Sequence, residues 1–128
     1  MNRRPLTLDD VPDKLLAEYG LRRGAATGPS YRCTDPAGAL VPLIEVIGPT
    51  HRKLNEEALR SLLRGVRDGA DLPPIIVFRE PGAAVATLLD GLHRVRLSLA
   101  VGFAVIPTTQ TSREDAELVY RYESPKPP

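Results

Sequence analysis

The part of the sequence that most constrains the fold is the pentapeptide Asp90-Gly91-Leu92-His93-Arg94, which directly follows an apolar run. Glycine permits the left-handed backbone that a sharp turn needs, and it lets the main chain approach a ligand closely. Where such a turn opens a helix, the free N–H groups of the first turn and a forked guanidinium can bind an anion. The pentapeptide therefore predicts a strand-to-helix turn that is suited to phosphate.

The same residues also fit a β-hairpin. Asp-Gly between apolar runs is a strong hairpin signal, and residues 94–99 alternate between polar and apolar side chains as a strand would. Against this, residues 92–101 are mostly Leu, Arg and Ala, which favour a helix, and Gly102 stands where a helix would end. Periodicity alone leaves both structures open.

The length of 128 residues, of which 42% are hydrophobic, predicts one domain with a modest core. Residues 1–39 are expected to form an N-terminal extension, with a short helix from Asp9 to Tyr19 and a loop that includes a short strand at 31–34. Residues 40–123 are expected to form the domain, and residues 124–128 a disordered tail. The expected elements of the domain are strands at 40–47, 75–78, 84–89 and 104–109, a helix from Asn55 to about Asp68, and a last helix from Arg113 to Tyr122.

The composition argues against several classes of function. A formal charge of +1 gives no global attraction to nucleic acid or to a membrane surface. The apolar runs are short and the N-terminus lacks an apolar segment, so neither a membrane span nor a secretory signal is expected, and we expect a cytoplasmic protein. Cys33, the single cysteine, forms no recognisable zinc-ligand set with His51 and His93. Any anion binding is therefore expected to be local.

The order of the motifs over about residues 41–110 resembles the ParB/sulfiredoxin superfamily. The motifs are a strand, a Pro-containing loop with Arg52, a helix, Pro-Pro-Ile-Ile-Val, a strand, Asp-Gly-Leu-His-Arg, and Ala-Val-Gly-Phe-Ala-Val-Ile-Pro. The resemblance implies an α+β fold, with a small mixed sheet of about four strands packed with helices, plus the N-terminal helical extension. It also implies a helix over 92–101 and a nucleotide phosphate held by Gly91, His93 and Arg94.

The departures from the superfamily concern the chemistry. Sulfiredoxin relies on a cysteine where this chain has Leu92, so sulfinic acid reduction is not expected. Chromosome-partitioning ParB proteins carry a Gly-Glu-Arg-Arg version of the motif. Free serine kinases of the superfamily carry Asp-Gly-His-His-Arg and use a glutamate in the loop after the first strand. That loop, residues 48–53, holds no carboxylate here, which puts transfer to serine in doubt.

The candidate phosphate ligands are the guanidinium of Arg94 and the backbone N–H groups of residues 92–94, which include Leu92. The alternative is that Arg94 is an arginine at the surface or at the rim of the core. His93 could donate to phosphate or act as a catalytic acid or base, or it could simply bond a backbone carbonyl. In the superfamily the loop after the first strand faces the same pocket, which implies that Arg52, His51 and Thr50 also bind the nucleotide.

Asp90 is the candidate catalytic carboxylate and magnesium ligand, and its alternative role is that of a helix cap. Glu45 interrupts an apolar strand and faces either solvent or the pocket. The leading hypothesis is a domain that binds a nucleoside triphosphate with Mg2+, with phosphoryl transfer or NTP hydrolysis as its activity. The alternatives are a DNA-binding protein or nuclease of ParB-like type, and a non-catalytic module that binds a protein partner or a second copy of itself.

Overall fold

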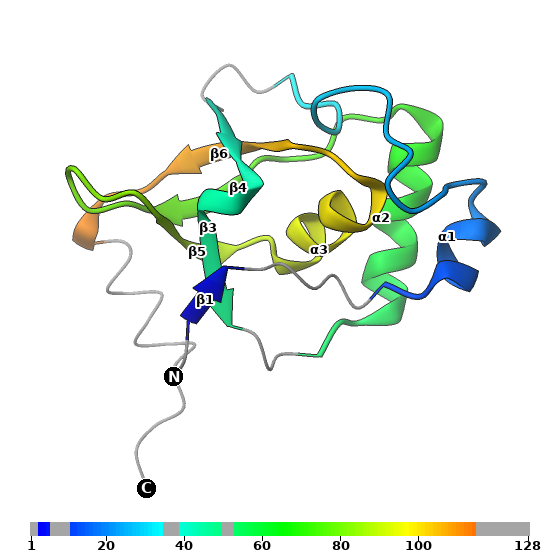
Figure 1. Ribbon diagram of the computed structural model, residues 1–128, viewed down its shortest axis with the longest axis horizontal. Coiled ribbons are helices and arrows are strands. Elements are labelled where there is room, and N and C mark those ends of the chain that lie inside the picture. Colours follow the sequence, from blue (N-terminus) through cyan, green and yellow to red (C-terminus); the bar gives the residue numbers. More distant parts are fainter. Residues whose placement is uncertain (1–2, 6–10, 35–38, 50–52, 115–128) are drawn as a thin grey trace, which may run out of the picture.

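The computed structural model describes residues 3–5, 11–34, 39–49 and 53–114, and Figure 1 shows how the elements are arranged. The elements are β1 (Arg3–Pro5), α1 (Asp13–Glu18), β2 (Ala39–Pro42), the 3-10 turn η1 (Leu43–Glu45), β3 (Val46–Pro49), α2 (Glu56–Asp68), β4 (Ile75–Phe78), β5 (Ala86–Asp90), α3 (Leu92–Val101) and β6 (Val105–Gln110). The fold is α+β, as predicted. Most of the predicted last helix, beyond residue 114, and the predicted tail lie outside the described residues.

The strands form one mixed sheet in the order β1-β3-β5-β4-β6-β2. Two neighbouring pairs are parallel, β3 with β5 and β4 with β6, and the remaining pairs are antiparallel. Because β3 and β5 run in the same direction, their carboxyl ends lie at the same edge of the sheet. β3 leads towards α2 and β5 leads into α3, so both helices begin near this edge.

The sheet curls strongly. β2 and β3 are four positions apart in the strand order, yet only η1 joins them. With strands about 4.8 Å apart, four spacings of a flat sheet would cover about 19 Å, whereas three residues of 3-10 helix cover about 6 Å. The end of β2 therefore meets the start of β3 across the curl, where the Leu43 N–H donates to Ala104 O at 3.0 Å.

This turn corrects the prediction of a single strand over 40–47. Leu43 and Val46, three positions apart, are both buried while Ile44 is exposed, which is the spacing of a 3-10 turn and not that of a strand. The described sheet also holds six strands rather than about four. The two additional strands, β1 and β2, are short edge strands, and β1 (Arg3–Pro5) carries no apolar alternation that would reveal it.

Helix α3 lies at the centre of the fold, between the sheet and α2 (Figure 1). Leu92 and Val95 pack into the core of the sheet, whereas Leu97, Ala100 and Val101 pack against α1 and α2. Seven of its ten residues are buried. A helix buried on several sides shows no single apolar stripe, which explains why periodicity alone could not distinguish it from a strand. The helix implied over 92–101 is confirmed.

The N-terminal region packs onto this core. In α1, Leu15 and Leu16 join the cluster formed by α2 and α3. The loop that follows satisfies the last carbonyls of α3, because the Gly24 N–H donates to Ala100 O and the Ala26 N–H donates to Val101 O, both at 2.9 Å. The predicted strand at 31–34 is absent: these residues are irregular, and the side chain of Tyr31 is buried among the sheet residues instead.

Candidate anion-binding site

Gly91 forms the N-cap of α3 in a left-handed conformation, with φ +112° and ψ 28°. A Cβ atom at this position would lie 2.6 Å from Ile75 Cγ2 and 3.2 Å from Arg94 Nε. Both the backbone angle and the lack of space therefore require glycine. Since glycine has no side chain to cap the helix, the first N–H groups of α3 gain no acceptor from it, and such groups can receive an anion.

Arg94, the principal predicted phosphate ligand, is largely engaged with the protein itself. Its Nη1 donates to Pro73 O and to Pro74 O, both at 3.0 Å, and its Nη2 lies 3.3 Å from Asp90 Oδ2. The side chain is only 11% exposed. Both hydrogens of Nη1 are used by these carbonyls, so the guanidinium holds the segment before β4 against α3.

Asp90 ends β5, and its carboxylate is 67% exposed beside the start of α3. It pairs with Arg94 one helical turn later and does not cap the helix, because Gly91 occupies the N-cap. Within the described ranges no three His, Cys, Asp or Glu side chains come together as a metal-binding group. Asp90 therefore brings one carboxylate to this edge, and a guanidinium partly neutralises it.

His93 connects the two helix N-termini. Its Nε2 accepts a hydrogen bond of 2.7 Å from the backbone N–H of Asn55. Asn55 is the N-cap of α2, and its Oδ1 accepts from the Ala58 N–H at 2.9 Å. A nitrogen that accepts carries no proton, so this imidazole is neutral and bears its proton on Nδ1. Sequence reasoning identified Asn55 as a cap but gave no signal for its contact with a histidine 38 positions away.

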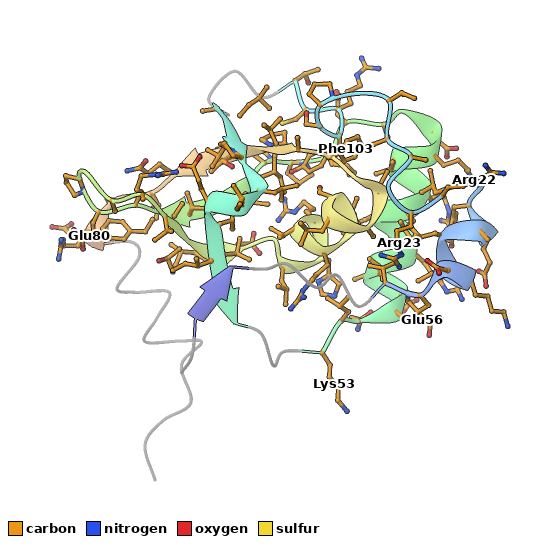
Figure 2. All side chains as sticks on the ribbon, in the orientation of Figure 1. Arg22, Arg23, Lys53, Glu56, Glu80 and Phe103 are labelled. Carbon is orange, nitrogen blue, oxygen red and sulfur yellow. The ribbon has the colours of Figure 1, made fainter. Side chains whose placement is uncertain are left out.

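The predicted binding residues Thr50, His51 and Arg52 lie outside the described residues, in the connection between β3 and α2. Lys53, which follows them, is exposed and extends away from the start of α2 (Figure 2). Two carboxylates, Glu56 and Glu57, occupy the first turn of α2. The edge thus combines two positive helix ends and a lysine with acidic side chains that would oppose an anion.

Glu45 and Tyr31 are two further residues whose polar side chains have partners within the fold. Glu45 was predicted to face either open solvent or the pocket, and it does neither. Its Oε1 pairs with Arg79 Nη1 at 3.2 Å in a partly buried contact. Burial raises the pKa of Tyr31 far above its usual range, although the charge of Arg94 acts in the opposite direction. The Tyr31 hydroxyl therefore stays protonated, and it donates to Pro73 O at 2.7 Å.

Neither the protein-family models nor the curated proteins with which the chain was compared gave a match. Among the described residues no helix has the length and apolar character that crossing a membrane would require. The function is therefore inferred from the residues at this edge of the sheet.

Proposed function

We propose that the chain is a nucleotide-binding domain of the ParB/sulfiredoxin type, which holds the phosphates of a nucleoside triphosphate where α2 and α3 begin. The observation that carries the proposal is the meeting of two helix N-termini, joined by the bond from the Asn55 N–H to His93 Nε2. Each helix N-terminus carries the equivalent of about half a positive charge. Two of them at one edge of a sheet favour a multiply charged anion.

In this proposal the backbone supplies most of the phosphate contacts. In the proposal the N–H groups of residues 92–94 point towards the anion, and Gly91 has no side-chain acceptor that would compete for them. Arg52, with His51 and Thr50, adds charge and donors from the connection that precedes α2. Arg94 acts as a positioning residue, because its contacts with Pro73 and Pro74 hold the strand-to-helix turn in place.

The activity proposed in addition to nucleotide binding is phosphoryl transfer or NTP hydrolysis. In it, Asp90 and His93 act as the acid–base groups. Mg2+ prefers oxygen ligands and commonly takes one or two carboxylates together with substrate phosphates. Asp90 offers one such oxygen, but the guanidinium of Arg94 competes for it at 3.3 Å. Binding with and without Mg2+ therefore decides whether the metal belongs to this site.

Titration calorimetry and thermal-shift measurements with ATP and CTP, each with and without MgCl2, test the proposal. Wild-type protein should give saturable heat, and a ligand at 100 times its Kd should raise the free energy of unfolding by about 2.7 kcal/mol. Arg52→Ala should weaken binding about tenfold, because a charge-assisted contact is lost. Arg64→Ala is the matched control, since this arginine is exposed within α2. Absence of saturable heat for every nucleotide would refute the proposal.

The exposed apolar side chains around β2 favour a second candidate, a protein-interaction module. Leu40 is 59% exposed on this edge strand, and Ile44 is 78% exposed in η1. An edge strand with exposed apolar side chains can pair with another chain. Light scattering over a range of concentrations tests self-association, and Ile44→Glu should return a dimer to monomer mass. A constant monomer mass excludes self-association by this route.

A further inference from the structure

A cavity of about 470 Å³ lies at the opposite end of α2 from the anion-binding site. It opens between the loop at 20–32 and the carboxyl ends of α2 and α3. Its apolar wall is formed mainly by Leu21, Tyr31, Val66, Val101 and Phe103. This volume and this lining are typical of a site for a small organic molecule.

The wall of the cavity is fixed by main-chain hydrogen bonds. Residues 24 and 26 of the loop donate to the last carbonyls of α3, and the Leu72 N–H donates to Arg32 O at 2.9 Å. Gly102 approaches the loop so closely that a Cβ there would lie 2.7 Å from Gly24 Cα. The cavity is therefore preformed, which lowers the entropic cost of binding a ligand.

Among the residues that the structure describes, the charged side chains that line the cavity are those of Arg22 and Arg32. Arg32 is already paired, with its Nε 3.0 Å from Asp71 Oδ1. Arg22 is exposed, and in the described part of the chain its guanidinium has no hydrogen-bond or ion-pair partner. Figure 2 shows Arg22 and Phe103 at the end of α2 that lies away from Lys53. The cavity thus carries an uncompensated positive charge at an apolar wall.

We propose that this cavity binds a small carboxylic acid with a flat apolar body. The carboxylate pairs with the guanidinium of Arg22, and the apolar body packs against Phe103 and Val66. A singly charged ligand suits this end of the molecule better than a phosphate does. The negative ends of both helix dipoles lie here, with Gly69 and Gly102 as the C-caps, and they oppose a multiply charged anion.

Titration of the isotope-labelled full chain with phenylacetate, followed by amide NMR spectra, tests this proposal. Saturable shifts are expected at the amides of Leu21, Val66 and Phe103. Phenylacetamide, which has the same shape without the charge, should bind about tenfold more weakly. Arg22→Gln should weaken phenylacetate binding to the same extent, and Arg64→Gln, the control, should leave it unchanged.

Three results would overturn the proposal. The first is the absence of saturable shifts in the wild-type spectrum. The second is equal affinity for phenylacetate and phenylacetamide, because the positive charge would then play no part in binding. The third is a set of shifts confined to the residues around Gly91 and His93, at the other end of α2. Since nucleotide binding is measured at that other end, the two proposals stand or fall separately.

Discussion

Tyr31 and Arg94 donate to the same acceptor, the carbonyl oxygen of Pro73, over 2.7 and 3.0 Å. The tyrosine comes from the loop after α1 and the arginine from the first turn of α3, so one main-chain atom joins three distant segments. Arg94 also bonds the next carbonyl, Pro74 O. Directly after these prolines comes Ile75, which is fully buried at the start of β4. The two donors therefore fix how β4 enters the sheet.

Replacement of Arg94 should cost stability as well as any ligand binding. Arg94→Ala removes two bonds to carbonyls and one contact with Asp90, and we expect the free energy of unfolding to fall by about 2–3 kcal/mol. Arg94→Lys should recover only part of this, since an ammonium lacks the planar fork. Urea denaturation measures both variants. Arg64→Ala, on the exposed face of α2, should change stability by less than about 0.5 kcal/mol. If Arg94→Ala changed stability as little as this control, the bonds from Arg94 to Pro73 O and Pro74 O would not be stabilising the fold.

The Tyr31 hydroxyl should make the stability of the protein fall in alkaline solution. Its pKa in the folded protein is raised above the ordinary value of 10.0 by burial. A raised folded pKa stabilises the folded state fully below pH 10, and this contribution is lost as the pH rises further towards the folded pKa. Unfolding free energies measured between pH 8 and pH 11 should therefore decline above about pH 10.

The matched variant is Tyr31→Phe, which keeps the ring and removes the hydroxyl. It should cost about 1 kcal/mol at neutral pH, because one hydrogen bond to Pro73 O is lost. It should also lose the part of the alkaline decline that the buried phenol causes. An identical pH profile for the wild type and this variant would mean that the phenol is not held protonated by the fold.

Much of the fold was accessible from local signals in the sequence. Asn55 and Gly69 mark the two ends of α2, and the apolar residues 75–78 form β4 as predicted. The break at η1 was missed because residues 40–47 are mostly apolar and β-branched, residue types that favour an unbroken strand. Periodicity could not show whether residues 92–101 form a helix or a strand, because α3 is buried on several sides and has no single apolar stripe. The order of the surrounding motifs was needed to predict the helix.

The candidate site was less accessible, since its decisive contacts are long-range. Nothing near Arg94 in the sequence indicates that the carbonyls of Pro73 and Pro74, about twenty positions earlier, will take its donors. The bond between Asn55 and His93 likewise depends on β3 and β5 being parallel neighbours. Gly91 and the cap residue Asn55 could be identified from local chemistry, because their roles at the two helix starts depend on the adjacent backbone.

Gly91→Ala should destabilise the protein more than the same substitution does at a glycine that has a positive φ but open space around it. Gly82 has a similarly positive φ of +79°, but a Cβ there would meet nothing within 4 Å, whereas a Cβ at Gly91 would meet Ile75 Cγ2 at 2.6 Å. Gly82→Ala therefore reports the backbone strain alone. We expect Gly91→Ala to cost about 1–3 kcal/mol more than Gly82→Ala, the usual penalty for overpacking. Equal costs in thermal denaturation would show that Ile75 moves aside freely.

The bond between the two helix N-termini predicts a defined tautomer for His93. Because Nε2 accepts from the Asn55 N–H, nitrogen NMR spectra at neutral pH should show a protonated Nδ1 and an unprotonated Nε2. In His93→Ala the amide of Asn55 loses its acceptor, so its hydrogen exchange should accelerate and the protein should lose about 1 kcal/mol of stability.

Asn55→Ala is the matched variant, because it removes the side-chain cap of α2 but retains the backbone N–H that donates to His93 Nε2. It should cost a similar amount yet leave the His93 tautomer unchanged. A proton found on Nε2 would show that the helices are not joined through this ring, and the support for an anion site at their meeting point would be lost.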